Sequence, residues 1–188
     1  MKPIFDHFGL LAPFYEFFIR PKDPEKIWRL ANLPPGAIVL DAGGGTGRVS
    51  QYLRGKAAQI IVADESFAML QEAHKKEGLQ PVRSYTEDLP FMSDIFDCII
   101  MVDALHHVAD QFKTSQELWR ILKPGGRLII EEPDIHVFGV KLIALAEKMA
   151  LMRSHFLSPQ QITHLFEGQA AKKRVEMEGP LAWVIIEK

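Results

Sequence analysis

A glycine-rich turn follows a short apolar stretch and brings a carboxylate with it. Residues 41–47 read Asp-Ala-Gly-Gly-Gly-Thr-Gly, directly after the apolar residues 37–40. Glycine lets a backbone turn tightly and approach a ligand closely. A helix that begins after the turn would add unpaired amide groups and the positive end of its dipole. The Asp41 carboxylate would attract a cationic amino or sulfonium group, whereas it would repel a pyrophosphate.

The spacing of the glycines leaves two classes of ligand open. A dinucleotide fingerprint has glycines at relative positions one, three and six. Gly43, Gly45 and Gly47 stand at positions one, three and five, although a frame of Ala42, Gly44 and Gly47 comes close to the dinucleotide pattern. An NAD-dependent oxidoreductase is therefore an alternative, but a chain of 188 residues is short for the partner domain that hydride chemistry needs.

A second carboxylate, Asp64, ends the apolar residues 60–63. A carboxylate at that position can bind both ribose hydroxyls of a dinucleotide or an adenosyl cofactor. The same side chain can instead cap a helix that starts near Ser66. The two roles can coexist.

Helices and strands alternate from Asp23 onward, which indicates how these side chains are positioned. We expect an α/β fold that is Rossmann-like and doubly wound, with a mostly parallel seven-stranded sheet and a C-terminal antiparallel hairpin. Such sheets bind ligands at the carboxyl ends of their strands, where the strand order reverses. The expected strands are residues 37–40, 60–63, 81–85, 96–102, 127–131, 175–177 and 183–186, and the expected helices are residues 24–32, 46–54, 66–77, 110–122, 137–152 and 159–167.

Further motifs occur in an order that resembles a known family. They are Val-Leu-Asp-Ala-Gly-Gly-Gly-Thr-Gly at 39–47, Asp-Glu-Ser at 64–66 with Met69-Leu70, Glu-Asp-Leu-Pro-Phe at 87–91, Phe-Asp at 96–97, Leu-His-His at 105–107 and Leu-Lys-Pro-Gly-Gly at 122–126. Over about residues 33–132 the chain resembles class I S-adenosylmethionine-dependent methyltransferases. It is most similar to the group that includes the ubiquinone/menaquinone-biosynthesis C-methyltransferases.

The resemblance implies S-adenosylmethionine as the cofactor and indicates which residues hold it. The glycine turn with Asp41 would hold the methionine part, Asp64 the ribose, and the segment after the third strand the adenine. The end of the fourth strand would lie beside the reactive methyl group. The cofactor-binding residues expected on this basis are Asp41, Ala42, Gly43, Gly45, Gly47, Asp64, Glu65, Met69, Tyr85, Thr86, Glu87, Asp88 and Asp103, and no metal ligand is expected.

One position departs from the family pattern. The family commonly has an acidic residue two positions before Glu87, where it receives the adenine amino group, and this chain has Tyr85 there. A tyrosine can stack or accept a hydrogen bond, but it is not a carboxylate. Adenine recognition would then depend on backbone groups near Thr86, on Glu87 or on Asp88.

The candidate catalytic residues follow the fourth strand. Asp103 and His106 are the strongest of them and His107 is weaker, since histidine is the usual base when one is needed. A wall or packing role is the alternative for His106. Orientation can supply about 7–11 kcal/mol of the barrier, whereas a general base adds about 10²–10⁴-fold, so positioning should outweigh any single residue.

We expect one domain over residues 1–188, with residues 1–32 as a helical cap or lid and residues 33–188 as the cofactor-binding core. The acceptor site would lie between an N-terminal aromatic stripe (Phe5, Phe8, Ala12, Tyr15 and Ile19) and residues 134–158. The expected activity is methyl transfer to a small or apolar acceptor, for which a quinone is one candidate. A scaffold or regulatory subunit that binds S-adenosylmethionine without catalysis is the non-enzymatic alternative.

The amino-acid composition restricts the possible binding partners and the cellular compartment. The net charge of −2 gives no broad field for nucleic acid, so a small-molecule acceptor is the expected partner. The single cysteine, Cys98, cannot form an internal disulfide, which favours a reducing, cytoplasmic compartment. No stretch is apolar enough for stable membrane insertion, and nothing in the sequence indicates an oligomeric state.

Overall fold

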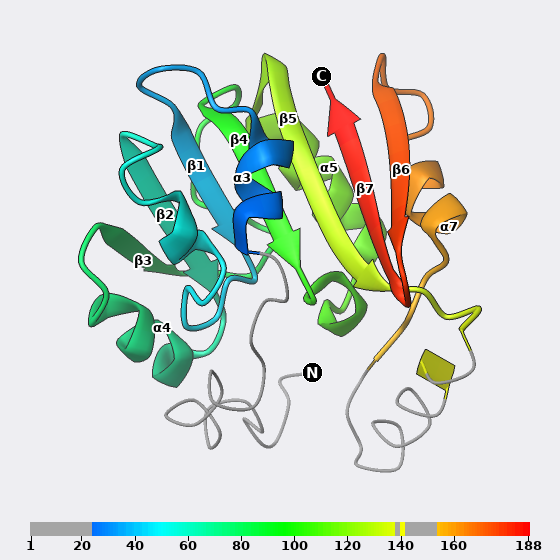
Figure 1. Cartoon of the computed structure of the whole chain (residues 1–188), viewed down its shortest axis with the longest axis horizontal. Helices are drawn as coiled ribbons and strands as arrows, with labels where there is room; N and C mark the ends of the chain where they lie inside the picture. The colour runs from blue at the N-terminus through cyan, green and yellow to red at the C-terminus, as the bar shows by residue number, and fades with distance from the viewer. Residues whose placement is uncertain (1–23, 138–139, 142–153) are drawn as a thin grey trace.

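The computed structural model describes residues 24–137, 140–141 and 154–188. A seven-stranded sheet with the order β3-β2-β1-β4-β5-β7-β6 runs through it (Figure 1). Strands β1 to β5 are parallel, and β7 pairs antiparallel with both β5 and β6. The predicted fold class is confirmed. The strands are β1 (Ile38–Ala42), β2 (Gln59–Asp64), β3 (Leu79–Arg83), β4 (Phe96–Val102), β5 (Leu122–Pro133), β6 (Lys172–Glu178) and β7 (Leu181–Glu187).

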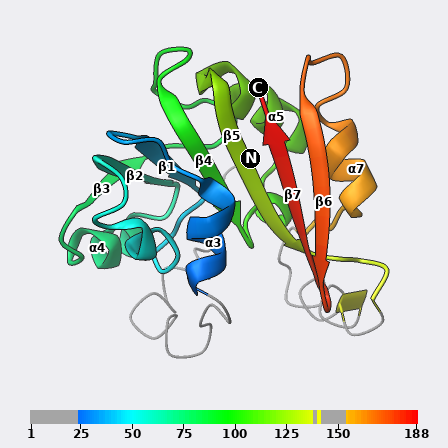
Figure 2. The same ribbon diagram turned by 45° about the horizontal axis from the view of Figure 1, so that its top comes forward.

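Helices pack on both faces of the sheet (Figure 2). One face is covered by α5 (Gln111–Ile121) and α7 (Pro159–His164), and the other by α3 (Pro24–Ala31), α4 (Phe67–His74) and the short 3₁₀ helix η2 (Ser50–Leu53). Successive side chains of a strand point to opposite faces. Within β4, Ile99 therefore joins one apolar cluster and Ile100 the other, which explains why residues 98–102 of this strand are a continuous apolar run.

The strand order reverses between β1 and β4, so the loops that follow these two strands meet. A Cβ atom added to Gly43 would lie 2.8 Å from the Cβ atom of Ala104. The glycine turn after β1 thus packs directly on the loop after β4. This contact joins the predicted cofactor-binding and catalytic segments.

The helix expected over residues 46–54 is wrong. The chain forms turns as far as Val49 and then only η2, because Gly47 has a φ of +70° and Gly55 a φ of +73°. Gly47 puts a left-handed residue into the first turn of the predicted helix, where a right-handed conformation would be needed. Any ligand at the turn would therefore be held by the turn itself and not by a helix terminus.

Of the seven strands, β4 alone has its predicted bounds, and the differences at β3 and β5 have a physical reason or add a new segment. β3 begins at Leu79 and ends at Arg83, although Pro81 lies inside it, because β3 pairs only with β2 and an edge strand tolerates proline. β5 is longer than expected, since it also includes residues 122–126. The expected helix over residues 137–152 lies mostly outside the described residues.

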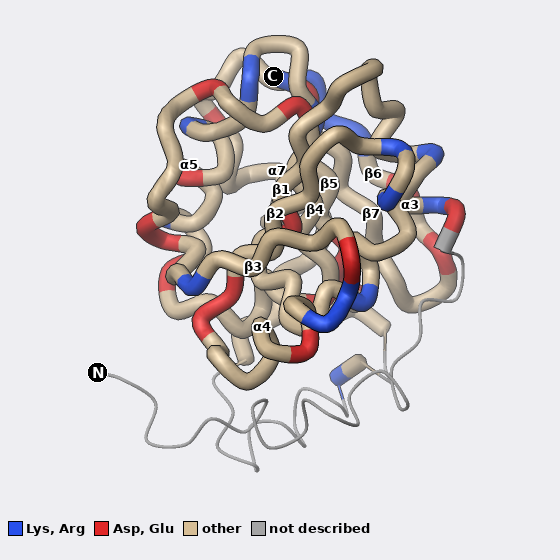
Figure 3. The backbone as a smooth tube through the Cα atoms, turned by 90° about the vertical axis from the view of Figure 1, so that its left-hand side faces the viewer, with Lys and Arg blue, Asp and Glu red and all other residues tan. Residues whose placement is uncertain are grey.

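The described part of the predicted cap is fixed on the sheet. Ile27, Leu30 and Ala31 of α3 are buried in the same apolar cluster as residues of β1 and β4, so α3 packs closely on the sheet. The aromatic stripe between residues 5 and 19 lies outside the described residues. Acidic and basic residues are interspersed along the described backbone in Figure 3.

Candidate active site

The backbone of the glycine turn adopts conformations that side chains would oppose. Gly43 and Gly45 have φ values of +68° and +55°, in the left-handed region that favours glycine. A Cβ atom on Gly47 would collide with the Leu79 side chain. The turn thus packs closely on the side chain of Leu79 at Gly47. At its glycines no side chain covers the backbone.

Asp41 is a buried carboxylate with an unsatisfied oxygen. Its side chain is 2% exposed, and Oδ2 has no hydrogen-bond partner among the described residues. Burial raises the pKa of Asp41 from 3.8 to about 6, although hydrogen bonding with Ser50 and the charge of the Arg48 guanidinium oppose the shift. A cationic ligand group beside Oδ2 would satisfy this oxygen and remove part of the cost of burying it.

Asp64 connects the end of β2 to the glycine turn. Its Oδ2 accepts a hydrogen bond from the Gly45 amide at 2.8 Å, and its Oδ1 accepts one from the Ser66 amide at 2.8 Å. The N-cap of α4 is Ser66, whose hydroxyl accepts from the Met69 amide. These two bonds tie the end of β2 to the glycine turn and to the start of α4.

Residues beside Asp64 contribute different surfaces. The Glu65 side chain is exposed, and its carbonyl oxygen accepts a bond from Arg83 Nε at 3.0 Å. Met69 is buried, with its sulfur 3.9 Å from the place a Cβ on Gly45 would occupy. Glu65 thus directly follows Asp64 in the chain, and Met69 lies close to Gly45 of the glycine turn.

The predicted adenine segment is partly committed to internal bonds. Glu87 Oε1 accepts from the amides of Ala109 and Asp110 at 2.9 and 3.1 Å, which ties the segment to the start of α5. The buried Thr86 hydroxyl bonds the Thr114 hydroxyl at 3.1 Å. Tyr85 is 50% exposed, and Asp88, its partner in an isolated β-bridge, is exposed too. Tyr85 and Asp88 are therefore the side chains of this segment most accessible to a ligand.

The end of β4 brings Asp103 close to Glu131 and Arg48. Asp103 has a φ of +55°, and its amide donates to the Glu131 carbonyl oxygen at 2.9 Å. Its Oδ2 lies 3.5 Å from Nη2 of the buried Arg48. Burial, together with the Asp103 charge, raises the pKa of Glu131 to about 7. Negative charge thus gathers around the Arg48 guanidinium at this point.

His106 follows on the same loop and contacts Glu132, whose side chain lies on the opposite face of β5 from that of Glu131. Its Nδ1 is 2.5 Å from Oε2 of Glu132, and both side chains are buried. The ring stacks on Phe156 at 4.2 Å between centroids and lies 3.9 Å from the His107 ring. Burial, and the neighbouring His106, lower the pKa of His107 to about 3. The two predicted catalytic residues, Asp103 and His106, therefore lie on one loop but have different partners, Arg48 and Glu132.

Residues 40–130 match the family model described as a methyltransferase domain. The chain carries an S-adenosylmethionine-dependent methyltransferase domain. The predicted family and cofactor are confirmed, because S-adenosylmethionine is the methyl donor of this family.

The curated relatives match part of their own length. A ubiquinone/menaquinone biosynthesis C-methyltransferase from Haemophilus ducreyi is 32% identical over 128 residues, which cover 60% of this chain and 49% of that protein. The enzyme of the same name from Pectobacterium carotovorum is 36% identical over 122 residues, covering 57% and 49%. The chain thus spans about half the length of these relatives.

Solved structures extend the likeness to nearly the whole chain. A Haloferax volcanii protein, solved in complex with the Trm112 methyltransferase activator, is 17% identical with a TM-score of 0.79 and covers 98% of this chain and 99% of that chain. A methyltransferase from Aquifex aeolicus is 20% identical with a TM-score of 0.72, covering 97% and 98%. At such identities the likeness shows the fold alone.

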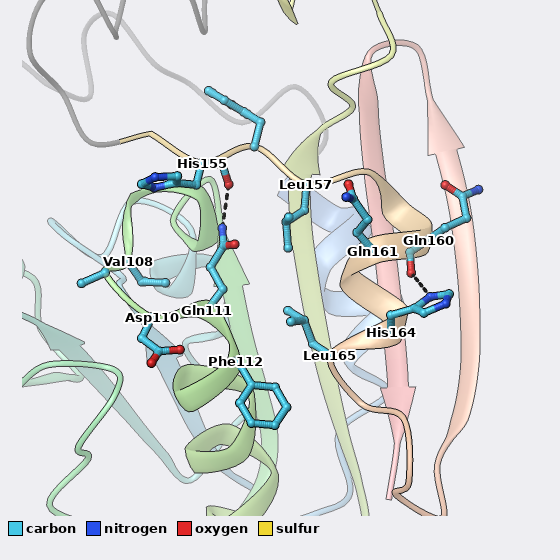
Figure 4. Close-up of a pocket in the computed structure, with 12 residues that line it drawn as sticks. Val108, Asp110, Gln111, Phe112, His155, Leu157, Gln160, Gln161, His164 and Leu165 are labelled. Atoms are coloured by element: carbon cyan, nitrogen blue, oxygen red, sulfur yellow. Dashed lines mark hydrogen bonds between the residues drawn. The ribbon is translucent and has the colours of Figure 1, made fainter.

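A groove of about 730 Å³ adjoins the His106 loop of the methyltransferase domain, between α5 and α7 (Figure 4). Its lining mixes apolar side chains with amides, namely Val108, Phe112, Leu157, Leu165, Gln111, Gln160 and Gln161. Phe156 also lines it and stacks on His106. Of the acceptor wall predicted from residues 134–158, residues 155–157 lie here; the rest of the lining comes from residues 108–112 and 160–165, which we did not predict.

Sequence reasoning missed three charged residues beside the candidate catalytic residues Asp103 and His106, namely Arg48, Glu131 and Glu132. A detectable signal existed, since two glutamates end an apolar strand at the edge of the sheet where ligands bind. Among the residues that the structure describes, no group of His, Cys, Asp or Glu could hold a metal ion. No helix in the described ranges is long and apolar enough to cross a membrane.

The unsatisfied Asp41 carboxylate leads to a prediction. Because its folded pKa of about 6 lies above 3.8, the folded domain binds more protons than the unfolded chain between these values. The free energy of unfolding therefore falls as pH rises through that window, by about 3 kcal/mol for this group. Asp41→Asn removes the buried charge and should stabilise the ligand-free domain by up to this amount at pH 7, while weakening cofactor binding.

Urea unfolding of the parent and Asp41→Asn at pH 7 and pH 4 measures this difference. We expect most of the gain at pH 7 to be lost near pH 4, where Asp41 is protonated in the folded domain and only partly ionised in the unfolded chain. An equal difference at both pH values would show that charge burial is not its cause.

Proposed function

We propose that this domain transfers the methyl group of S-adenosylmethionine to a small or apolar acceptor, with a quinone-like ring as the candidate class. The observation that carries the proposal is the buried Asp41 carboxylate, with one oxygen unsatisfied among the described residues, beside the glycine turn. An amino acid ammonium or a sulfonium would supply the missing positive charge. The names of the curated relatives support the acceptor class.

The residues of the site fit this cofactor. Asp41 and the turn of Ala42, Gly43, Gly45 and Gly47 would hold its methionine part. Asp64, with Glu65 and Met69 beside it, would hold the ribose. The adenine would lie against Tyr85, Thr86, Glu87 and Asp88, where the exposed Tyr85 ring can stack. Asp103 would lie close to the donor's positive charge, since its carboxylate stands at the end of β4 next to Arg48.

The bound cofactor supplies an activated methyl group, so the chain's own contribution is orientation and proton transfer. The loops after β1 and β4 pack on each other at Gly43 and Ala104, which fixes the distance between donor and acceptor sites. His106 would accept the proton that the acceptor loses. The groove next to Phe156 would hold the apolar part of the acceptor.

We propose that residues 1–188 form one domain, with residues 33–188 as its core. α3 packs on that core as a cap.

A thermal-shift and transfer experiment tests the function. S-adenosylhomocysteine should raise the unfolding temperature, because a ligand that binds only the native state stabilises it. NAD at the same concentration should not. Methyl-labelled S-adenosylmethionine should then label a benzoquinol or naphthoquinol with a free ring position. Stabilisation without labelling of any acceptor would favour a binding scaffold, and a response to NAD alone would contradict the site assignment.

A further inference from the structure

Glu132 is a buried carboxylate that no motif singled out. It precedes the last residue of β5 and is 2% exposed. Its neighbour Glu131 points to the opposite face, as alternate strand residues do. Burying a carboxylate is costly unless hydrogen bonds compensate for its lost hydration. The bonds that Glu132 makes therefore indicate its purpose.

Three donors converge on this one side chain. Oε1 accepts from the amides of Ala104 and Leu105, at 3.0 and 2.7 Å. Oε2 is the partner of His106 Nδ1, at 2.5 Å. All three donors belong to the loop that follows β4. One residue of β5 thus fixes both the backbone of that loop and the ring that it carries.

The same bond determines where the hydrogen of the His106 ring resides. A carboxylate oxygen only accepts, so Nδ1 carries a hydrogen and, in the neutral ring, Nε2 carries the lone pair. A carboxylate behind an imidazole fixes its tautomer and orientation and makes the far nitrogen more basic. This arrangement suits a base that acts through Nε2.

Packing and further hydrogen bonds restrict the ring from the other sides. Phe156 stacks on the ring with an interplanar angle of 15°. The His155 amide donates to the His106 carbonyl oxygen at 2.7 Å. Gln111 Nε2 donates to the carbonyl oxygens of Leu105 and His155, at 3.0 and 2.6 Å, and so joins the two segments (Figure 4). The ring is held by three elements of the fold.

We propose that Glu132 is a positioning residue for methyl transfer, which fixes the loop after β4 and holds His106 with its hydrogen on Nδ1. The inference rests on the proposed role of His106 as the base. As the acceptor atom bonds to the methyl carbon, the electron pair of the broken carbon–sulfur bond stays on sulfur. The acceptor's proton passes to Nε2, and the Glu132 carboxylate balances the charge of the resulting imidazolium.

The tautomer can be observed without any substrate. Long-range ¹H–¹⁵N correlation spectra of the labelled domain at pH 7.5 distinguish a protonated Nδ1 from a protonated Nε2. The signals of His106 are identified by their loss in His106→Asn. We expect Nδ1–H in the parent protein. In Glu132→Gln the amide group can donate to Nδ1, so we expect a shift toward Nε2–H. A parent ring protonated on Nε2, or on both nitrogens, would overturn the proposal.

Kinetics provide the second readout. Glu132→Gln should lower kcat by about 10–100-fold, the usual cost of losing a partner behind a functional histidine, with KM and S-adenosylhomocysteine affinity unchanged. In the His106→Asn background the same substitution should add little. Glu117→Gln is the matched control, since Glu117 also accepts a backbone amide, from Leu89 at 3.2 Å, and bonds the Arg120 side chain. That control should cost stability without lowering kcat.

The outcomes separate this inference from the proposed function. If His106→Asn loses activity while Glu132→Gln keeps both the tautomer and kcat, only the inference about Glu132 fails. If His106→Asn is fully active, the proposed base fails, whatever the tautomer. Should Glu132→Gln not fold, the parent spectrum and Glu132→Asp decide, since the shorter carboxylate should retain Nδ1–H and part of the activity.

Discussion

His106→Asn is expected to lower kcat by about 10²–10⁴-fold, the contribution typical of a general base. The asparagine amide can still donate to Glu132 in place of Nδ1, so the buried carboxylate keeps its partner. It has no second nitrogen that could accept a proton. KM and the dissociation constant of S-adenosylhomocysteine should stay near those of the parent, since the substitution removes an interaction made only in the transition state.

Initial-rate measurements with labelled S-adenosylmethionine, and calorimetric titration with S-adenosylhomocysteine, check this result. His74→Asn is the control, since His74 is exposed at the end of α4. An unchanged kcat in His106→Asn would assign the ring a packing role. A loss of cofactor affinity equal to the loss of kcat would place it in the binding site instead.

Asp64→Ala is expected to weaken S-adenosylhomocysteine binding by about 10²–10⁴-fold. The loss corresponds to two hydrogen bonds to a charged group at about 1.5–3 kcal/mol each. Asp64 also accepts the Gly45 and Ser66 amides at 2.8 Å, so its removal should loosen the glycine turn as well. The measurement is calorimetric titration at fixed ionic strength.

Asp97→Ala is the matched control for this experiment. Asp97 also accepts a backbone amide, from Ile38 at 2.9 Å, and pairs with Lys123, but it lies at the opposite end of the sheet. It should reduce stability and leave affinity unchanged. Parent-like affinity in Asp64→Ala would refute the ribose assignment, and equal losses in both variants would indicate a general effect on the fold.

Local chemistry explains what could be predicted from the sequence. β4 has the predicted bounds, because a strand buried on both faces is a continuous apolar run that ends at polar residues. The hairpin at Gly179-Pro180 and the positive φ of Gly43 likewise follow from residues adjacent in the chain. The helix predicted after the turn is wrong because closely spaced glycines interrupt it. These glycines are a local signal, but the expected strand–turn–helix pattern favoured a helix in spite of them.

Contacts between distant residues explain what could not be predicted. Glu132 and His106 are 26 positions apart, and only the parallel register of β4 and β5, which pairs Val102 with Glu131, brings them together. Glu87 also makes contacts that its own segment does not reveal. The resemblance implied adenine recognition, whereas in the structure its carboxylate accepts two backbone amides at the start of α5. Strand register and loop placement are properties of the folded sheet, so they cannot be recognised in the sequence of a single segment.

The buried Asp41 carboxylate has a consequence for how long the protein survives in a cell. Proteases degrade the unfolded chain, so lifetime follows the fraction unfolded at each moment. A buried carboxylate with one oxygen that lacks a hydrogen-bond partner among the described residues destabilises the ligand-free domain, and a bound donor would shift the population toward the folded form. Abundance would then rise and fall with methyl-donor supply, and copies formed during donor starvation would be removed first.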